Sequence, residues 1–179
     1  ELKRAVVTGL GAITPLGNDV ETTWTNAVAG KSGAGPITLF DASLFKTRFA
    51  CEVKDFNPAD LFDRKEARKY DRYSQLAVHA AKVIFAAGIG GIRTFEEEVG
   101  GYYLAMDKGP RFNPFFIPKM IADIAAGHIS MIYGLRGPNY ATVSACASST
   151  NAIVDAFNLI RLGKANVIVS GGAEATISP

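Results

Sequence analysis

VSACASSTNAIVDAFNLIRLG, residues 143–163, decides the fold, because a strand-like run gives way to a helix-like run inside it. The strand-like run is NYATVSAC over residues 139–146, and the helix pattern covers residues 147–163. A second strand-like run, ANVIVSGGAEA over residues 165–175, follows a short connection at Gly163. Strand, helix and strand joined this closely predict a βαβ unit, which implies a parallel sheet buried on both faces. We therefore expect an α/β fold.

Cys146 lies where the first strand-like run meets the helix, in the first helical turn on this pattern. The helix is apolar on most sides, with Val154, Phe157 and Ile160 at helical spacing, and we expect it to be buried. Unpaired N–H groups and the positive end of the dipole favour an anion such as a thiolate at its start. A strand-to-helix elbow would also present the sulfur as the serine elbow of hydrolases presents its hydroxyl. A small buried cysteine is an equally good interpretation of these residues alone.

Other segments complete the expected fold. Short strands are predicted over residues 4–11 and 83–91, and an edge strand over residues 47–53. Asn18 or Asp19 can cap a helix that Gly30 ends. Further helices are predicted over residues 63–82, 96–106 and 119–134.

The junction between Lys82 and Val83 joins a predicted helix to a predicted strand without a turn residue. A connection of about 2–6 residues containing Gly, Asn or Pro is usual at such a junction. Either the helix and strand assignment is wrong at this point, or residues are missing there. Residues 1–179 otherwise fit one domain.

Composition limits the possible functions. The chain has 179 residues, 48% of them hydrophobic, and a formal net charge of +2, which gives no strong field for nucleic acid. Cys51 and Cys146 do not form a disulfide framework, which favours a reduced, cytoplasmic protein. His79 and His128 are the two histidines, and no cluster has metal-ligand spacing, so no metal or cofactor is expected. No apolar run is long enough to span a membrane.

A set of motifs in the chain resembles the β-ketoacyl-acyl-carrier-protein synthases, closest to the type II condensing enzymes of fatty-acid synthesis. The motifs occur in the family's order and cover nearly the whole chain. They are RAVVTGLGAITPLGNDVETTW (4–24), GIGGIRTFEEE (88–98), GPRFNPFFIP (109–118), AAGHISMIYGLRGPN (125–139), VSACASSTNAI (143–153) and ANVIVSGGAEA (165–175).

The resemblance implies a thiolase-like fold with layered αβαβα architecture, a mixed and largely parallel sheet, and a homodimer. This chain is similar to the first of two halves, so we expect a second half in the natural protein. The family also has extra residues between the helix of residues 63–82 and the strand of residues 83–91, so the resemblance implies an omitted segment at the junction between Lys82 and Val83. The family joins acyl chains by decarboxylative Claisen condensation. By this resemblance Cys146 is the nucleophile that takes the acyl group from acyl carrier protein, and its backbone N–H is part of an oxyanion hole. Malonyl carrier protein then loses CO₂ and attacks the thioester.

The family's second half supplies two histidines, a lysine and a Gly-Phe-Gly-Gly loop. His79 and His128 do not match these residues, so we expect both to be structural. This stretch alone is therefore not expected to catalyse the condensation.

Two more groups of residues gain a role from the resemblance. Lys65, Arg68 and Lys69 are spaced to share one helical face, which alone would indicate a solvated charged surface. The matching positions of the family bind the acidic carrier protein. Ile89 and Phe116 match residues that line or gate the acyl pocket, although both also fit core packing. The glycines beside Ile89 would let its backbone shift at low cost.

Two alternatives remain within the fold. ACASS (145–149) is close to the cysteine motif of polyketide-type ketosynthases, whereas GIGGIRTFEEE (88–98) favours the fatty-acid enzyme. A non-catalytic partner similar to a chain-length factor lacks the nucleophile, and Cys146 argues against it.

Overall fold

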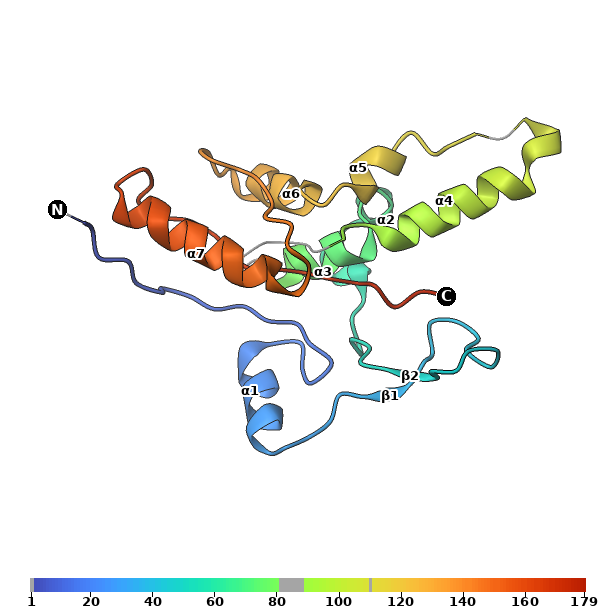
Figure 1. Ribbon diagram of the computed structural model, residues 1–179, viewed down its shortest axis with the longest axis horizontal. Helices are drawn as coiled ribbons and strands as arrows, with labels where there is room; N and C mark the ends of the chain where they lie inside the picture. The colour runs from blue at the N-terminus through green and yellow to red at the C-terminus, as the bar shows by residue number, and fades with distance from the viewer. Residues whose placement is uncertain (1, 81–88, 110) are drawn as a thin grey trace.

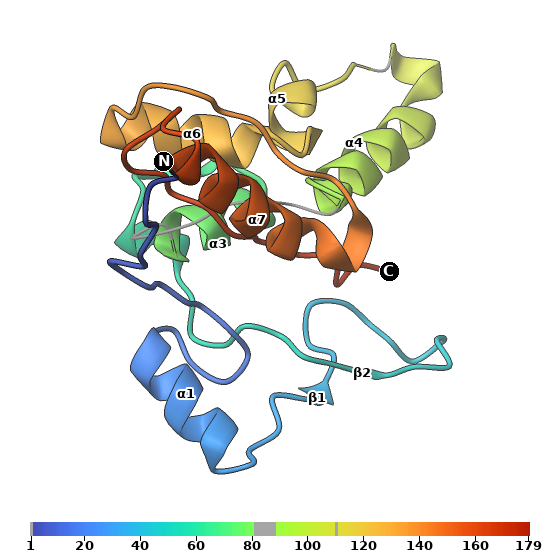
Figure 2. The same ribbon diagram turned by 60° about the vertical axis from the view of Figure 1, so that its left-hand side comes forward.

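The computed structural model describes residues 2–80, 89–109 and 111–179 (Figure 1). Seven α-helices are found in these residues: α1 (Val20–Val28), α2 (Arg64–Ala67), α3 (Arg72–Ala80), α4 (Ile92–Leu104), α5 (Phe116–Met120), α6 (Ile124–Tyr133) and α7 (Ser148–Arg161). Two strands, β1 (Gly35–Pro36) and β2 (Phe49–Ala50), and three 3₁₀ turns, η1 (Pro58–Asp60), η2 (Met106–Lys108) and η3 (Ala145–Ala147), complete the described elements. Figures 1 and 2 show α3 to α7 together, with α1 and the two strands in a separate layer below them.

The best-packed part of the molecule lies between α3 and α6. Tyr73 and Ala77 of α3 are fully buried, and they meet Ala125 and Ile129 of α6, which are 2% exposed. The small side chains of α6 allow the two helices to approach closely. This α3–α6 core is reinforced by the Tyr73 hydroxyl, which donates a hydrogen bond of 2.6 Å to the carbonyl of Ile121.

The helix predicted over residues 63–82 is two helices, α2 and α3, in the described part up to residue 80. Asp63 caps α2 by accepting the N–H groups of Lys65 and Glu66. A new helix begins after Asp71, whose carboxylate accepts the N–H of Tyr73 at 3.2 Å. The helix predicted over residues 119–134 is likewise divided into α5 and α6, because Ile121 has an extended backbone, with ψ of 139°.

Other helix predictions are closer to the structure. Asp19 caps α1 by accepting the N–H of Thr22 at 2.7 Å, and Gly30 follows the helix with φ of +67°. The helix predicted over residues 96–106 is α4, which starts earlier, at Ile92. None of the helices in the described ranges is both long and apolar enough to cross a membrane.

The predicted strands differ most from the structure. The edge strand over residues 47–53 is present as β2, which pairs antiparallel with β1. Residues 4–11, 139–146 and 165–175 are not strands, since no sheet ladder joins them within the described residues. The strand predicted over residues 83–91 lies mostly outside the described residues, as does the junction between Lys82 and Val83.

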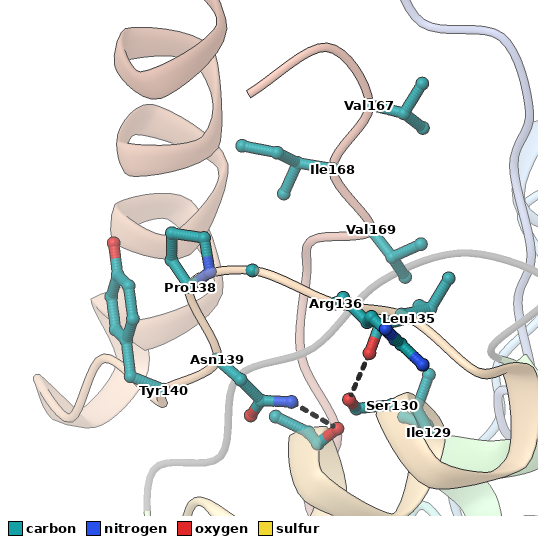
Figure 3. A pocket seen from close by; sticks show the side chains of 12 residues that line it. Ile129, Ser130, Leu135, Arg136, Pro138, Asn139, Tyr140, Val167, Ile168 and Val169 are labelled. Carbon is teal, nitrogen blue, oxygen red and sulfur yellow. Dashed lines mark hydrogen bonds between the residues drawn. The ribbon is translucent and has the colours of Figure 1, made fainter. Parts of the chain in front are cut away.

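The path of the expected βαβ unit is nevertheless visible in Figure 3. Pro138 and Tyr140 lie across a cavity of about 180 Å³ from Val167, Ile168 and Val169. A second cavity is lined by the same two segments and by α7. No sheet ladder joins the two segments within the described residues. The expected parallel sheet is therefore not shown by the described residues.

The expected burial of α7 is wrong for this chain. Ile153, Val154 and Phe157 are 51%, 49% and 45% exposed, and the buried residues of the helix are Ser148 and Ala156. The prediction was based on apolar residues that recur on most sides of the helix, and the described residues provide no sheet to cover them. The apolar side chains of α7 consequently face solvent.

Candidate active site

Cys146 occupies the middle of the η3 turn, directly before α7. The preceding residue, Ala145, has φ of +49°, in the left-handed region that residues other than glycine seldom adopt. Such local backbone strain is typical of functional turns that reverse the chain sharply. The predicted elbow is therefore present as a 3₁₀ turn, and Cys146 precedes the helix instead of lying within its first turn.

Ser148 holds this elbow in shape. It is 3% exposed, and its hydroxyl accepts the N–H of Ser144 at 2.9 Å while donating to the carbonyl of Ala145 at 2.7 Å. Thr142 donates to the carbonyl of Ser148 at 2.8 Å. These bonds close the turn on both sides of Cys146. No role could be assigned to Ser148 from the sequence, because its partners Ser144 and Ala145 lie in the turn before the helix and are reached only once the turn has formed.

The start of α7 can receive an anion. Its N-cap residue, Ala147, has no side chain that could accept the leading N–H groups, and none of the described side chains caps them. A helix N-terminus in this state favours negative charge, either a thiolate or the oxygen of a tetrahedral intermediate. Cys146 is a free thiol and exposed, so the alternative of a small buried cysteine is wrong.

Cys146 lines a cavity of about 390 Å³, which we call the Cys146 cavity. Its lining also includes Ile89, Ser149, Glu174 and Thr176. The N–H of Ile89 donates to the Glu174 carboxylate at 3.2 Å. The structure therefore brings together two residues that the sequence analysis placed in one site, Cys146 and Ile89, although 57 positions separate them in the chain.

Phe116 is not among the described residues that line this cavity. It begins α5 and belongs to an aromatic row, with its ring 5.0 Å from Phe112 and 6.3 Å from Phe95 of α4. Tyr102 of α4 stacks on Phe112 at 4.8 Å and extends the row. The observed contacts are those of packing between α4 and α5, and a pocket role for Phe116 stays a prediction.

The basic residues share one helical face only in part. Lys65 lies in α2, Arg68 is its C-cap residue, and Lys69 lies beyond the helix. Lys65 and Arg68 are exposed. Lys69 forms an ion pair of 2.5 Å with Glu66, and that hydrogen bond raises the pKa of the Lys69 ammonium. Lys65 and Arg68 are therefore better placed than Lys69 to contact a partner.

Neither histidine is among the residues lining the Cys146 cavity. His128 is 8% exposed, and its ring lies 4.2 Å from that of Tyr70. Burial lowers the pKa of His128, with a smaller opposing effect from Glu66. His79 contacts the carbonyl of Asn18 at 3.1 Å. In the described residues, no group of three or more His, Cys, Asp and Glu side chains could hold a metal ion.

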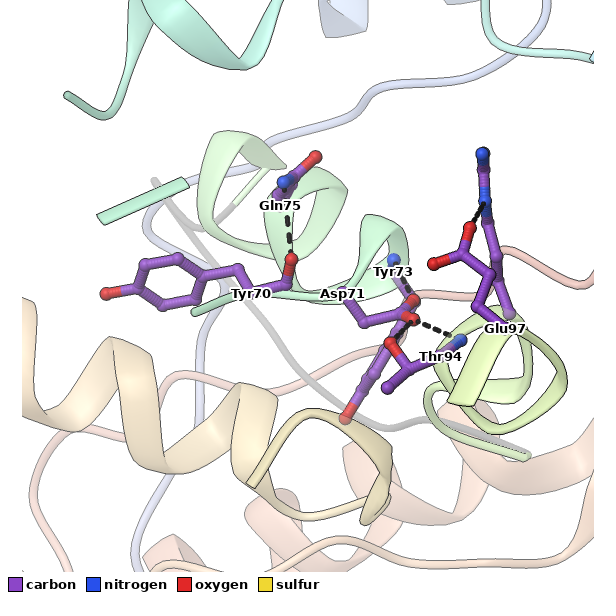
Figure 4. Close-up of polar contacts among 7 residues, drawn as sticks. Tyr70, Asp71, Tyr73, Gln75, Thr94 and Glu97 are labelled. Carbon is purple, nitrogen blue, oxygen red and sulfur yellow. Dashed lines mark hydrogen bonds and ion pairs between the residues drawn. The ribbon is translucent and has the colours of Figure 1, made fainter. Parts of the chain in front are cut away.

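Asp71 is a second residue that the sequence analysis overlooked (Figure 4). It is 4% exposed, and one carboxylate oxygen accepts both the N–H of Thr94 at 3.1 Å and its hydroxyl at 2.5 Å. The other oxygen accepts the N–H of Tyr73. Asp71 therefore joins the starts of α3 and α4, and α4 follows directly after the loop that carries Ile89. An aspartate directly before a helix is a preferred N-cap residue, and this was the available signal for a new helix.

The family model described as "Beta-ketoacyl synthase, N-terminal domain" matches residues 3–179. The chain belongs to the β-ketoacyl synthase family.

Relatives agree with this assignment. The protein named 3-oxoacyl-[acyl-carrier-protein] synthase 2 from Synechocystis sp. is 45% identical over 100% of this chain, and that from Staphylococcus aureus (strain COL) is 43% identical over 98% of it. In both cases the match covers 47% of the relative, so the chain spans about half the length of the curated relatives it matches.

Solved structures share the thiolase-like ketosynthase fold. The ishigamide ketosynthase/chain length factor has a TM-score of 0.86 at 26% identity, covering 98% of this chain and 48% of that one. A type II polyketide ketosynthase in complex with its acyl carrier protein has a TM-score of 0.80 at 23% identity, covering 100% and 53%. The β-ketoacyl synthase assignment thus extends to the arrangement of the chain in space, although the described residues contain only the two-stranded sheet.

Proposed function

We propose that the β-ketoacyl synthase containing this chain elongates fatty acids by decarboxylative condensation, with Cys146 as the nucleophile. The observation that carries the proposal is the position of Cys146, exposed in a cavity, on a strained turn, at an uncapped helix start. A thiolate there attacks the thioester of an acyl carrier protein, and the carrier's sulfur leaves and takes up a proton. The acyl chain is then held as a thioester on Cys146.

The second half-reaction uses the same turn. Malonyl carrier protein loses CO₂, and the resulting enolate carbon attacks the acyl carbon on Cys146. The backbone N–H of Cys146 and the leading amides of α7 can stabilise the oxyanion of this step. The C–S bond breaks, Cys146 departs as a thiolate, and the 3-oxoacyl product stays on the carrier. We propose that residues outside this chain provide the histidines, the lysine and the Gly-Phe-Gly-Gly loop of the family's site.

Lys65, Arg68 and Lys69 form the proposed docking surface for acyl carrier protein. Exposure of Lys65 and Arg68 supports this proposal, since complementary charge mainly raises the rate of encounter and is screened by salt. We propose Ile89 and Phe116 as residues of the acyl pocket, with the stronger support for Ile89. We also propose that the full-length protein is a cytoplasmic homodimer. Sedimentation of the full-length protein would test whether it is a dimer.

The fatty-acid function is favoured over the polyketide alternative by sequence similarity. Relatives at 43–45% identity are named 3-oxoacyl-[acyl-carrier-protein] synthase 2, whereas the ishigamide and type II polyketide structures are 23–26% identical. A non-catalytic partner is disfavoured because a thiol is present and accessible at the elbow.

The test uses the full-length protein and acyl carrier protein loaded with an acyl chain. Peptide mass spectrometry should find the acyl group on Cys146 and not on Cys51, and malonyl carrier protein should then release it as a 3-oxoacyl product. The Cys146→Ala variant should accept no acyl group. Acylation of Cys51, or none in the wild type, would contradict the proposal.

A further inference from the structure

Two segments that line the Cys146 cavity are held in different ways. The loop that carries Ile89 is held by its backbone, since a Cβ added to Gly90 or Gly91 would clash with the carbonyl oxygens of residues 119–120. The turn that carries Cys146 is held instead by hydrogen bonds, several of which come from side chains. A single substitution can therefore disturb the turn more easily than the loop.

Ser144 anchors the turn, because each of its polar groups is bonded to a residue beyond Cys146. Its N–H donates to the hydroxyl of Ser148 at 2.9 Å, and its carbonyl accepts the N–H of Ala147 at 3.1 Å. Its hydroxyl accepts a hydrogen bond of 2.6 Å from the side-chain amide of Asn151. The chain before Cys146 is thus tied to the chain after it at each of these groups.

These bonds surround the strained residue of the turn, Ala145. Its φ of +49° brings its Cβ close to its own backbone and is unfavourable for alanine. A strained conformation of this kind persists only where the surrounding contacts enforce it. The amide of Asn151 is one of these contacts, and it comes from within α7, beyond the turn itself.

Asn151 suits the turn better than it suits the helix. Asparagine is a poor helix former, because its side chain competes for nearby backbone groups. In α7 the amide of Asn151 reaches back to the side chain of Ser144. Neither of the two residues is among the described residues that line the Cys146 cavity. Any effect of Asn151 on Cys146 must therefore pass through the shape of the turn.

We propose that Asn151 is a positioning residue for acyl transfer, which holds Ser144 and thereby keeps the sulfur of Cys146 at the start of α7. The proposal rests on the proposed function and adds a residue to it. Without the amide, Ala145 is free to return to a more favourable φ, and the sulfur is displaced from the leading N–H groups of α7. Cys146 then reacts more slowly, in a protein that still folds.

The first measurement is acyl transfer from loaded acyl carrier protein to the full-length protein. Asn151→Ala should lower the rate of Cys146 acylation at saturating carrier protein by about two- to fivefold, where fivefold corresponds to the whole effect of one hydrogen bond. The KM for the carrier protein should stay unchanged, because the proposed docking residues Lys65 and Arg68 are intact. A general loss of structure would change both quantities.

The second measurement needs no carrier protein. Iodoacetamide alkylates Cys146, and peptide mass spectrometry follows the rate. Because the thiolate is the reacting form and the leading N–H groups of α7 favour it, Asn151→Ala should slow this reaction by a similar factor. Melting temperatures should show that the variant is folded.

Asn158→Ala is the matched control. Asn158 is an exposed asparagine of the same helix, and no hydrogen bond of its side chain is found in the described residues. Both substitutions replace a poor helix former by a good one, so only Asn151→Ala removes the bond to the turn. The acylation and alkylation rates of Asn158→Ala should equal those of the wild type.

Ser144→Ala removes the other partner of the bond and keeps the N–H and carbonyl of residue 144. If the two side chains act through one hydrogen bond, the double variant should be no slower than Asn151→Ala alone. Effects that multiply in the double variant would exclude the shared bond and overturn the proposal.

An unchanged alkylation rate in Asn151→Ala would also overturn it, as would an equal decrease in Asn158→Ala. Failure of the proposed function is a separate outcome. A wild type that accepts no acyl group from carrier protein would contradict that function alone, and the alkylation rates would still decide whether Asn151 positions Cys146.

Discussion

The helices α6 and α7 are both rich in apolar residues, yet their surroundings differ. Ala125 and Ile129 of α6 are 2% exposed, because they pack against Tyr73 and Ala77 of α3. In α7, by contrast, Phe157 is 45% exposed, although it lies on an apolar face of similar character. Solvent therefore reaches the apolar face of α7, which the sequence predicts to be buried.

This difference shows that apolar periodicity identifies a face but not its partner. The partner of α6 is α3, about 50 residues earlier in the same chain. The described residues that contact α7 leave Ile153, Val154 and Phe157 about half exposed. In the layered αβαβα architecture of the family a helix layer lies between two sheets, so the remainder of a full-length protein is expected to cover α7. Substitutions in the two regions should therefore have very different effects.

The largest loss of stability is expected for Tyr73→Ala in the α3–α6 core. Removing a fully buried ring leaves a cavity and should lower the free energy of unfolding by about 3–5 kcal/mol. Burial raises the pKa of Tyr73 to about 12, so its hydroxyl stays protonated and donates to Ile121 over the usual pH range. Tyr73→Phe removes only this bond and should cost about 1 kcal/mol. Urea unfolding of the three proteins gives both values, and equal losses would contradict the ranking.

A smaller effect is expected for Asp71→Ala, which removes the link between α3 and α4. Loss of the carboxylate leaves the N–H groups of Tyr73 and Thr94 without an acceptor, at a cost of about 2–3 kcal/mol. Hydrogen exchange should increase at the start of α4 but little in α6. Asp71→Asn keeps one acceptor oxygen and should lie between the wild type and Asp71→Ala. Faster exchange throughout α6 would show that the two regions are not independent.

The hydrogen bonds at the N-terminal end of α7 are tested by Ser148→Ala. The N–H of Ser144 and the carbonyl of Ala145 each lose a partner, which should cost about 1–2 kcal/mol. The rate of Cys146 alkylation should change as well, because the elbow is no longer held. Thr150→Ala is the control, since Thr150 does not line the Cys146 cavity and no hydrogen bond of its side chain is found in the described residues. An unchanged alkylation rate in Ser148→Ala would exclude the positioning of Cys146 by this hydroxyl.

The α3–α6 core should also depend on pH through His128. Its pKa is lowered by burial from the ordinary value of 6.5, so the unfolded chain binds the proton first as the pH falls. Stability is therefore full above about pH 6.5 and decreases below it. Melting temperatures at pH 7.5 and 5.5 should show this decrease in the wild type and less of it in His128→Leu. His79→Leu serves as the control, and a decrease of equal size in His128→Leu would disprove the assignment.

The smallest effect in this chain is expected for Phe157→Ala in α7. Because half of the ring surface is already exposed, the loss should be about 1 kcal/mol or less. In the full-length protein the same change should cost about 3–5 kcal/mol, if a sheet covers the helix there. Unfolding of both lengths measures the difference. Equal losses would show that α7 is not covered by the remainder of the protein.

Local signals in the sequence predicted local structure well. Asp19 and Gly30 delimit α1 as expected, and the helix predicted over residues 147–163 corresponds to α7 with its preceding turn. These features depend on capping and turn preferences of a few neighbouring residues. The start of α3 at Asp71 was missed although the aspartate is a local capping signal, whereas its bond to Thr94 is distant in sequence and could not be predicted.

Features that depend on distant segments were predicted less well. A strand over residues 165–175 needs a neighbouring backbone, and the described residues place a cavity beside part of it. The proximity of Cys146 to Ile89 was available only through the resemblance to a family. Glu174 could not be selected at all, since a single exposed carboxylate carries no signal until the N–H that it accepts is known.

The close packing of Gly90 and Gly91 against Lys119 and Met120 limits how the sequences of related chains can diverge. Two loops whose backbones touch cannot change length independently, because an insertion in one would displace the other. Variation in the shape of the Cys146 cavity should therefore arise by exchange of side chains around position 89, while insertions and deletions accumulate elsewhere in the chain.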